Sequence, residues 1–440
     1  MRKAALHNLG CKVNAYESEA MQQLLEQAGY EIVPFREWAD VYIVNTCSVT
    51  NIADRKSRQM LHRARKQNPG AVVVAAGCYV QSAADELKKD LAVDVLIGNN
   101  KKQELIPILE EYFRQLPETK KDGKGIAEHV IDIGNTKEYE ALHIGSTAGH
   151  TRAFIKIQDG CNQFCSYCII PYTRGRVRSR LPQEIEREAM ALAGAGYQEI
   201  VLTGIHLSSY GIGLPEPENL LGLIRRLHRL EGIARIRLGS LEPRIITREF
   251  VQALSGLPKL CPHFHLSLQS GCDETLRRMN RHYTTGEYAR CCAFLRDAFP
   301  TAAITTDVIV GFPGETEAEF AETKAFLENI HFYEMHVFKY SVRSGTRAAT
   351  MPCQIPEAKK TRRSEELLSL EKKMSLQYRQ GFLNLPQEVL LEEGTVIQGV
   401  PYLIGHTREY VKIAVPAPGH RPNTIATVIP GRMLTEEILA

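Results

Sequence analysis

Short apolar runs alternate with amphipathic helical patterns through the N-terminal part of the chain. Strands that alternate with helices are typical of βαβ units, in which the strands lie parallel and helices cover the sheet. We therefore predict an N-terminal parallel sheet, followed by a turn-rich, charged break at residues 116–125. The predicted strands are residues 4–9, 41–45, 72–76 and 93–97, and the predicted helices are residues 17–28, 53–67 and 83–91.

The same alternation returns with a longer period in the middle of the chain. Six strand candidates predict an open or partial βα barrel, because a closed barrel of this type has eight units. A charged helix is predicted at residues 356–379, and short strands broken by Gly and Pro follow it, which indicates a small antiparallel β-barrel. The central strands are residues 153–158, 199–203, 235–239, 264–268, 304–310 and 333–340, and the C-terminal strands are residues 389–391, 395–399, 403–405, 410–414 and 424–429.

These patterns predict an α/β protein with three domains. The N-terminal βα domain spans residues 1–116 and is followed by a connector at residues 117–150. The partial (βα)6 barrel with its trailing helix spans residues 151–374, and the small β-barrel spans residues 375–440. A length of 440 residues agrees with three domains, at about 150 residues each.

Composition and charge exclude several classes of protein. The chain has 54 Lys and Arg against 51 Asp and Glu, and this net charge of +3 excludes a basic coat over the whole surface but not a local basic patch. No apolar run reaches the ~18 residues of a membrane-spanning helix, and the N-terminus lacks the apolar stretch of a signal peptide. We expect a cytoplasmic protein, in which closely spaced cysteines indicate metal or redox chemistry rather than disulfides.

Three cysteines in a CxxxCxxC pattern give the sharpest chemical signal. Cys161, Cys165 and Cys168 come directly after the first strand of the predicted barrel, at the end where βα folds place reactive groups. Three thiolates so close together can hold three corners of a cubane iron–sulfur cluster and leave the fourth iron open to a small chelating molecule. A structural zinc site is the alternative, but it normally closes with a fourth Cys or His at short spacing, and none follows here.

Three further cysteines share one position relative to their strands. Cys11, Cys47 and Cys78 each follow an apolar strand of the N-terminal domain at once or within two residues. Because the carboxyl ends of parallel strands meet at one edge of a sheet, we expect the three thiols to converge there. One such thiol is often an ordinary buried cysteine, but three at the same place in three units favour a second site with three ligands.

The remaining cysteines and the histidines show no ligand spacing. We interpret the cysteines as ordinary buried thiols, and His263 and His265, which flank the start of a strand, as structural. These cysteines are Cys261, Cys272, Cys291, Cys292 and Cys353.

The Cys161 loop resembles that of the radical S-adenosylmethionine (SAM) enzymes, in which the fourth iron binds SAM. Tyr167 stands at the aromatic position that this family has before its last cysteine. With the upstream cysteines and the C-terminal barrel, nearly the whole chain resembles the methylthiotransferases, whose three domains have this order. The resemblance implies two [4Fe–4S] clusters, with Cys11, Cys47 and Cys78 at the auxiliary one, and a C-terminal TRAM domain, an OB-like module that binds RNA.

Other loops after the central strands support a SAM pocket. Glycines allow the backbone to approach a ligand closely, and Gly204 and Gly311 stand in two of these loops. Glu242, Gln269 and Asp307 offer groups for a ribose or an amine. Each loop alone fits ordinary turn chemistry, but all lie at the edge that carries the Cys161 loop. The resemblance implies SAM and substrate contacts at these positions.

Basic residues cluster in two places despite the balanced total. Residues 51–70 carry six positive side chains and one acid, which fits either a solvated helix face or an RNA contact. Alternating arginines just after the cluster loop favour phosphate contacts at the mouth of the site. The last 66 residues are not basic, so a C-terminal RNA contact would depend on shape and a few side chains. The candidate RNA-binding residues are Arg55, Arg58, Arg63, Arg174, Arg176 and Arg178.

The resemblance also implies a reaction. An aromatic C–H bond resists ionic substitution, and clusters with SAM provide a radical route. In this family the Cys161-type cluster reduces SAM to a 5′-deoxyadenosyl radical, and the auxiliary cluster carries a sulfur that another SAM methylates. The implied partners are a tRNA, a reduced electron donor of the flavodoxin or ferredoxin type, and a sulfur source; no membrane is involved.

Four segments resemble the threonylcarbamoyladenosine branch of the family most closely. We therefore expect conversion of N6-threonylcarbamoyladenosine at tRNA position 37 to its 2-methylthio derivative. The same reaction on N6-isopentenyladenosine is the alternative, and a non-catalytic iron–sulfur RNA sensor is a more distant one. The segments are Leu-Gly-Cys-Lys-Val-Asn at 9–14, Asn-Thr-Cys-Ser-Val-Thr at 45–50, Lys-Ile-Gln-Asp-Gly-Cys at 156–161 and His-Phe-His-Leu-Ser-Leu-Gln at 263–269.

Overall fold

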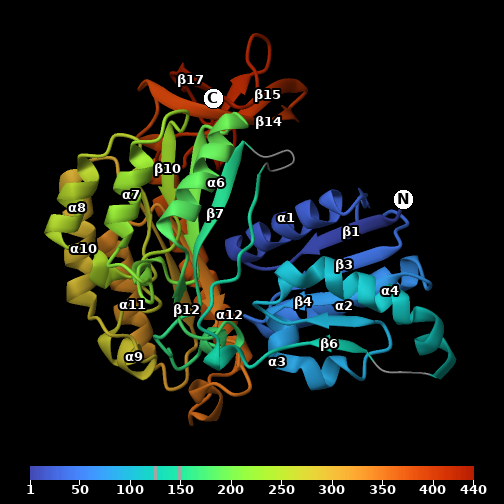
Figure 1. Ribbon diagram of the computed structural model, residues 1–440. Coiled ribbons are helices and arrows are strands. Elements are labelled where there is room, and N and C mark those ends of the chain that lie inside the picture. The colour runs from blue at the N-terminus through green and yellow to red at the C-terminus, as the bar shows by residue number, and fades with distance from the viewer. Residues whose placement is uncertain (123–125, 146–150) are drawn as a thin grey trace.

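The computed structural model describes residues 1–122, 126–145 and 151–440 (Figure 1). An N-terminal α/β region, a curled central sheet with outer helices and a C-terminal β region follow one another along the chain, in agreement with the predicted fold class. Among these residues, no helix is long and apolar enough to cross a membrane.

The N-terminal region is a parallel sheet covered by helices on both faces. Its elements are β1 (Lys3–Asn8), α1 (Lys12–Gln27), β2 (Glu31–Ile32), β3 (Val41–Thr46), α2 (Asn51–Gln67), β4 (Val72–Gly77), α3 (Cys78–Leu87), β5 (Val95–Ile97), α4 (Leu105–Asp122) and β6 (Ala127–His129). The strand order is β2-β1-β3-β4-β5-β6. Val41 and Ile43 of β3 pack with α1 and α4, whereas Tyr42 and Val44 pack with α2 and α3. Both faces are therefore covered, which explains why β3 and β4 are buried at every position.

Two element boundaries differ from the prediction. Helix α4 continues to Asp122, so the break predicted to begin at residue 116 falls inside a helix; Glu and Lys, which enrich this segment, are good helix formers. Helix α3 begins at Cys78 itself and is kinked at Ala83, where the predicted helix started. Cys78 is therefore held at a helix N-terminus instead of in a loop.

The central region is a curled sheet of parallel strands with helices on its outer face. Its elements are β7 (Arg152–Asp159), α5 (Ile170–Thr173), β8 (Arg178–Ser179), α6 (Pro182–Gly194), β9 (Glu199–Gly204), α7 (Leu220–His228), β10 (Arg235–Leu238), α8 (Arg248–Ser255), β11 (His263–His265), α9 (Asp273–Arg278), α10 (Thr285–Ala298), β12 (Ala303–Val310), α11 (Glu317–Ile330) and β13 (Glu334–Lys339). The pairings are β10-β9-β7-β8 and β11-β12-β13, and single bridges such as Leu241 with Leu266 connect the two halves. This is the open barrel of six parallel units that the sequence predicted, with β8 added antiparallel at an edge.

The C-terminal region is a mainly antiparallel sheet that closes one end of the barrel. Helix α12 (Glu357–Gln380) runs along β13 and leads into β14 (Gln387–Ile397), β15 (Val400–His406), β16 (Lys412–Pro416), β17 (Thr424–Val428) and β18 (Ile438–Leu439). The order is β17-β14-β15-β16-β18, with β18 parallel to β16. Two predicted strands merge into β14, which has a bulge between Leu391 and Glu393. No β17–β18 pairing closes a barrel among the described residues, so the pairings give an open sheet.

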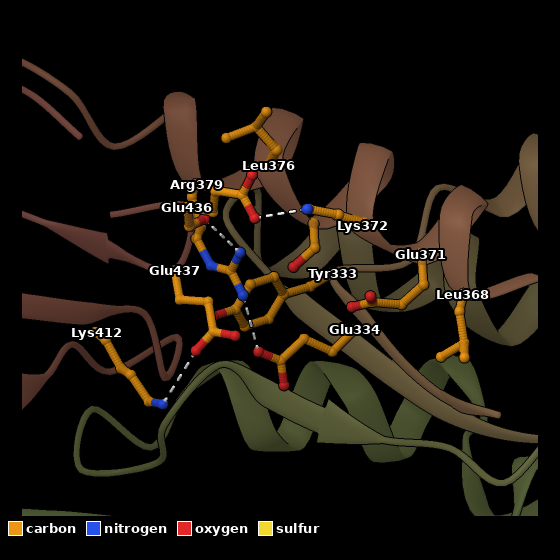
Figure 2. Close-up of a pocket in the computed structure, with 11 residues that line it drawn as sticks. Tyr333, Glu334, Leu368, Glu371, Lys372, Leu376, Arg379, Lys412, Glu436 and Glu437 are labelled. Carbon is orange, nitrogen blue, oxygen red and sulfur yellow. Dashed lines mark hydrogen bonds and ion pairs between the residues drawn. The ribbon is translucent and has the colours of Figure 1, made fainter. Parts of the chain in front are cut away.

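A groove of about 400 Å³ lies where α12 meets the C-terminal sheet (Figure 2). Lys372 of α12 pairs with Glu436 of the C-terminal region at 2.6 Å, and Arg379 of α12 pairs with Glu334 of β13 at 3.3 Å. Arg379 also donates to the backbone carbonyl of Glu436 at 3.1 Å. The groove contains none of the six candidate ligand cysteines, and most of its charged side chains are paired. We interpret it as the seam that fastens the C-terminal sheet to the barrel.

Candidate functional site

The structure brings the three N-terminal cysteines to the carboxyl edge of the parallel sheet. Cys11 caps the N-terminus of α1, Cys47 follows β3, and Cys78 begins α3. Asn14 ties the first two loops together, because its amide donates to the carbonyls of Leu9 at 2.7 Å and Thr46 at 3.0 Å.

The packing around these thiols is close. Gly10 has φ +106°, and a Cβ at that position would lie 2.9 Å from the sulfur of Cys47. Only glycine fits there without displacing the thiol. Burial raises the pKa of Cys47 to about 12, and each of the three thiols interacts electrostatically with another of them. Three converging thiols that must release their protons to bind iron are a donor set that fits an iron–sulfur cluster.

The second cysteine set lines a cavity of about 130 Å³ at the carboxyl edge of the barrel. Cys161, Cys165 and Cys168 follow β7 and lie on one side of this cavity. Burial raises the pKa of Cys168 to about 12 and that of Cys161 to about 11. Three thiols beside a small cavity fit a cluster with one iron open to a ligand.

Three of the predicted SAM contacts line this cavity: Tyr167, Glu242 and Gln269. Gln269 has φ +71°, a conformation that non-glycine residues rarely adopt. Burial alone would raise the pKa of Glu242, but hydrogen bonds with His206 and Arg244 lower it to about 2. Glu242 is therefore an anion at neutral pH, suited to an ammonium group or a ribose hydroxyl.

The other three predicted contacts do not belong to the lining of that cavity. Gly204 packs on Gln158, and a Cβ at Gly311 would lie 2.3 Å from Lys360. Both glycines therefore serve close packing inside the protein. Asp307 lies on β12 and contacts His265 on the neighbouring strand instead.

Among the lining residues that the sequence analysis did not identify, two carry titratable side chains, His206 and Arg281. His206 follows β9 and accompanies Glu242, with 3.5 Å between Nε2 and Oε2. Arg281 lies beyond α9 and donates from Nη1 to the sulfur of Cys165 at 3.2 Å. His206 follows a predicted strand, and this position could have identified it as a residue at the carboxyl edge of the barrel. Arg281 lies in a turn after a short helix, and nothing in the neighbouring sequence indicates its contact with Cys165.

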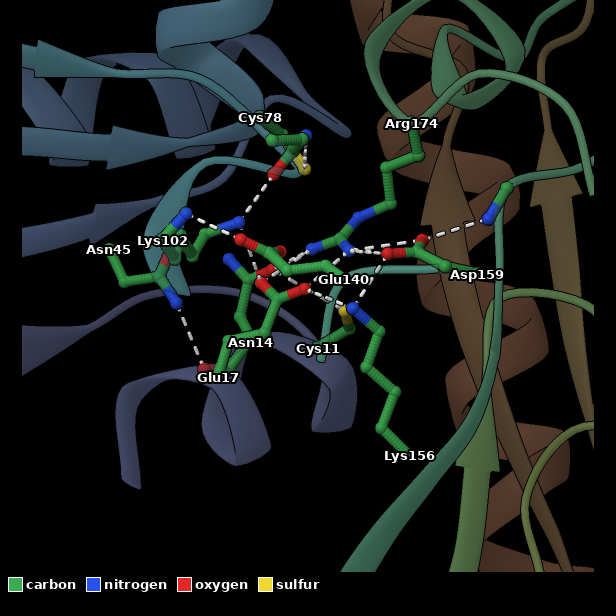
Figure 3. A network of polar contacts seen from close by, with 12 residues as sticks. Cys11, Asn14, Glu17, Asn45, Cys78, Lys102, Glu140, Lys156, Asp159 and Arg174 are labelled. Atoms are coloured by element: carbon green, nitrogen blue, oxygen red, sulfur yellow. Dashed lines mark hydrogen bonds and ion pairs between the residues drawn. The ribbon is translucent and has the colours of Figure 1, made fainter. Parts of the chain in front are cut away.

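A buried network of charges connects the N-terminal region with the barrel beside Cys11 and Cys78 (Figure 3). Its centre is Glu17 of α1, whose carboxylate lies 2.7 Å from Lys156, 2.8 Å from Arg174 and 3.1 Å from Lys102. Burial would raise the pKa of Glu17, but these cations hold it well below its usual value. Asp159 of β7 completes the network at 2.7 Å from Lys156. Arg174 also donates to Asn14 at 2.6 Å, so the helix that follows Cys11 and the turn that follows Cys168 are held together.

This network corrects part of the RNA-binding prediction. Arg174 and Arg178 are 0% and 2% exposed and pair with buried carboxylates, so they do not offer their charge to an RNA phosphate at the surface. The sequence showed an alternating arginine run but not that its partners come from α1 and β7. Arg176 is exposed beside the Phe164 ring, and Arg55, Arg58 and Arg63 are exposed on α2.

The inner face of the barrel holds a polar group that the spacing did not reveal. Ligand-capable atoms of His265, Asp307 and His336 lie within 4.8 Å of one another, on three neighbouring strands. His265 bonds Thr305 at 2.9 Å and Asp307 at 3.2 Å on the neighbouring strand, contacts that agree with the structural role predicted for it.

Burial corrects one of the cysteine predictions, and it also bears on Lys12, the residue after Cys11. Cys353 is exposed, so the prediction of a buried thiol is wrong there, whereas the other four non-ligand cysteines are buried. Lys12 has solvent-accessible surface, yet burial lowers the pKa of its amine, and its electrostatic partners Arg237, Arg152, Asp307 and Glu199 all belong to the barrel. The Lys12 side chain therefore lies near charged residues of the barrel and remains accessible.

Comparison with known protein families matches two segments of the chain. Residues 3–98 match the uncharacterized protein family UPF0004, and residues 155–327 match the radical SAM superfamily. The second match implies SAM and a [4Fe–4S] cluster. Among solved structures, the radical SAM methyltransferase TsrM from Kitasatospora setae has a similar fold, with a TM-score of 0.55 and 15% identity over 79% of this chain and 77% of that one.

Several relatives match over nearly the whole chain. The threonylcarbamoyladenosine tRNA methylthiotransferase MtaB of Bacillus subtilis is 41% identical over 94% of this chain and 90% of its own length. The protein of the same name from Aquifex aeolicus is 41% identical over 84% of this chain and 88% of its own. A tRNA-2-methylthio-N(6)-dimethylallyladenosine synthase from Moorella thermoacetica is 38% identical over 92% of this chain and 90% of its own.

Proposed function

The chain belongs to the radical SAM methylthiotransferases, and from this membership we propose that it replaces the C2 hydrogen of N6-threonylcarbamoyladenosine at tRNA position 37 by a methylthio group. The observation that carries the substrate is the 41% identity to relatives with that name over most of both chains. Isopentenyladenosine tRNA is the second candidate, because a relative named for the dimethylallyl substrate is 38% identical.

Two clusters and SAM complete the proposed enzyme. Cys161, Cys165 and Cys168 would hold one [4Fe–4S] cluster with an iron open to SAM, and the three N-terminal cysteines would hold a second. When bound, these groups supply one-electron reduction of SAM and a sulfur for transfer.

The chain's own side chains then bind and orient. Glu242 stays ionised through its contacts with His206 and Arg244, and it offers an acceptor to the cationic or hydroxyl groups of SAM. Arg281 donates to the Cys165 sulfur and so orients that ligand. The Glu17 network fixes the distance between the two cysteine sets, which a transfer onto one base requires.

The proposed partners follow from this reaction. The exposed arginines of α2, together with Arg176, support a contact with the tRNA backbone. The reaction also needs a reduced electron donor of the flavodoxin or ferredoxin type and a sulfur source. We place the protein in the cytoplasm, where its tRNA substrate is found.

Mass spectrometry of tRNA nucleosides tests the proposal directly. The chain is expressed in a host that lacks the activity, and we expect a methylthio increment on threonylcarbamoyladenosine. An increment on isopentenyladenosine alone would move the enzyme to the other substrate. No tRNA increment from a protein that holds its clusters and cleaves SAM would refute the tRNA assignment, and absence of SAM cleavage would favour an iron–sulfur sensor.

Single cysteine variants separate the two sites. Cys165→Ala should abolish formation of 5′-deoxyadenosine and remove about half of the bound iron, because one cluster loses a ligand. Cys47→Ala should retain SAM cleavage and lose the methylthio product. Cys353→Ala, at an exposed thiol, and Cys261→Ala, at a buried one, are the matched controls. A Cys47→Ala enzyme that still methylthiolates tRNA would contradict the role of the N-terminal set.

A further inference from the structure

Lys12 lies at the boundary between the N-terminal region and the barrel. It is the first residue of α1, directly after Cys11, and α1 contacts β7 and β9 of the barrel. The charges that act on its amine come from the barrel, with Asp307 and Glu199 attracting and Arg237 and Arg152 repelling. The amine of Lys12 therefore lies close enough to these barrel residues to interact with their charges.

Lys12 differs from other cations at this boundary because it has no carboxylate partner. Arg237 pairs with Glu199 at 2.7 Å, Arg152 with Glu392 at 3.2 Å, and Lys156 with Glu17 at 2.7 Å. Within the described part of the chain, no carboxylate oxygen lies within 4.0 Å of the Lys12 amine and no hydrogen bond is formed by it. A cation that is accessible and has no carboxylate partner is available to an anionic ligand from outside the chain.

The surroundings strengthen the preference for an anion. The pKa of His263 is lowered well below its usual value, first by burial and then by the positive charges of Arg237 and Lys12. Arg237 and Lys12 therefore both lie near His263, and of the two only Arg237 has a carboxylate partner among the described residues. An anionic ligand is favoured there, and a neutral apolar group would leave the charge unsatisfied.

We propose that Lys12 is a specificity-determining residue that binds the carboxylate of the threonylcarbamoyl group. This inference rests on the proposed function, and it supplies a physical reason for the substrate. The threonylcarbamoyl group ends in a carboxylate and also carries a hydroxyl and urea N–H groups, whereas an isopentenyl group is wholly apolar. A site built on a cation rejects the apolar substituent because its polar groups would remain unpaired.

The Asp307 group provides the second half of the recognition. Asp307 interacts electrostatically with Lys12 and is held by His265 at 3.2 Å, with His336 in register on the next strand. The Asp307 carboxylate accepts hydrogen bonds, so it is complementary to the hydroxyl and the urea N–H donors of the threonylcarbamoyl group. Lys12 matches the carboxylate. One site therefore contains complementary partners for both ends of the substituent.

The test measures equilibrium binding of anticodon stem-loops to the reconstituted holoenzyme by fluorescence anisotropy. The stem-loops carry threonylcarbamoyladenosine, its carboxyl methyl ester, or unmodified adenosine. The wild-type protein should bind the free acid about 10- to 100-fold more tightly than the ester, as for a hydrogen bond to a charged group. Lys12→Gln should remove that difference by weakening the free acid alone. Lys89→Gln, at an exposed lysine of the same domain, is the matched control.

Each other outcome overturns the inference in a distinguishable way. Equal wild-type affinity for acid and ester would refute carboxylate recognition without reliance on any variant. An equal loss for all three stem-loops in Lys12→Gln would show that Lys12 contacts an RNA phosphate instead. Formation of the methylthio product is measured in parallel. A wild-type enzyme that binds the acid more tightly than the ester but forms no methylthio product would contradict the proposed function. An enzyme that forms the product but binds acid and ester equally would contradict only the role of Lys12.

Discussion

Neutralising Glu17 tests whether the buried network holds the two cysteine sites together. Glu17→Gln keeps the size of the side chain but removes its charge. Lys156 and Arg174 retain Asp159, at 2.7 Å and 3.2 Å. Lys102 is fully buried, and among the described residues it would be left without a carboxylate partner. Breaking a buried pair in this way costs about 3–5 kcal/mol, which would favour opening of the domain interface by roughly 150- to 5,000-fold.

Hydrogen–deuterium exchange provides the assay, because it reports opening locally in a protein with several domains. We expect faster exchange in the peptides that contain α1 and β7, and unchanged exchange in the C-terminal sheet. Glu26→Gln, at an exposed position of the same helix, is the control and should change the opening free energy by less than about 0.5 kcal/mol. If exchange at α1 and β7 is the same in both variants, the network does not fasten the domains and the reasoning is wrong.

Three further expectations concern the cluster loop, pH and tRNA. Arg281→Gln should lower SAM cleavage about 10- to 100-fold, because the Cys165 sulfur loses a charged donor at 3.2 Å; rates as high as those of Arg277→Gln, an exposed neighbour, would contradict this. The pKa of Glu17 is held well below 4.5, so its contribution to interface stability should be complete above about pH 4.5 and should decline as the pH falls further, which exchange between pH 7 and pH 3 would detect. Replacing Arg55, Arg58 and Arg63 by Gln should weaken tRNA binding. The slope of log K against log salt concentration should also decrease in magnitude by about 0.7–0.9 for each phosphate that the protein no longer neutralises. A slope equal to that of the control Arg114→Gln, on α4, would exclude α2 from the tRNA interface.

Local sequence determined the elements and the positions of the six candidate ligands. The strands β3 and β4 are continuous apolar runs, and continuous runs are typical of parallel strands buried on both faces. Once a parallel sheet is expected, a cysteine that follows each of three strands has to lie at the carboxyl edge. The CxxxCxxC spacing places its three thiols within one loop. These features depend on neighbours along the chain, so the sequence alone was sufficient to predict them.

Tertiary structure decided which charged and polar residues are available to a ligand. Arg174 and Arg176 are alike in sequence, but Glu17 from another domain buries the first and leaves the second exposed. Gly311 resembles a ligand-binding glycine, yet Lys360 of a later helix fills the space beside it. The approach of Lys12 to Asp307 likewise depends on how α1 enters the barrel. Pairing and burial depend on contacts between residues far apart in the chain, and no local pattern contains that information.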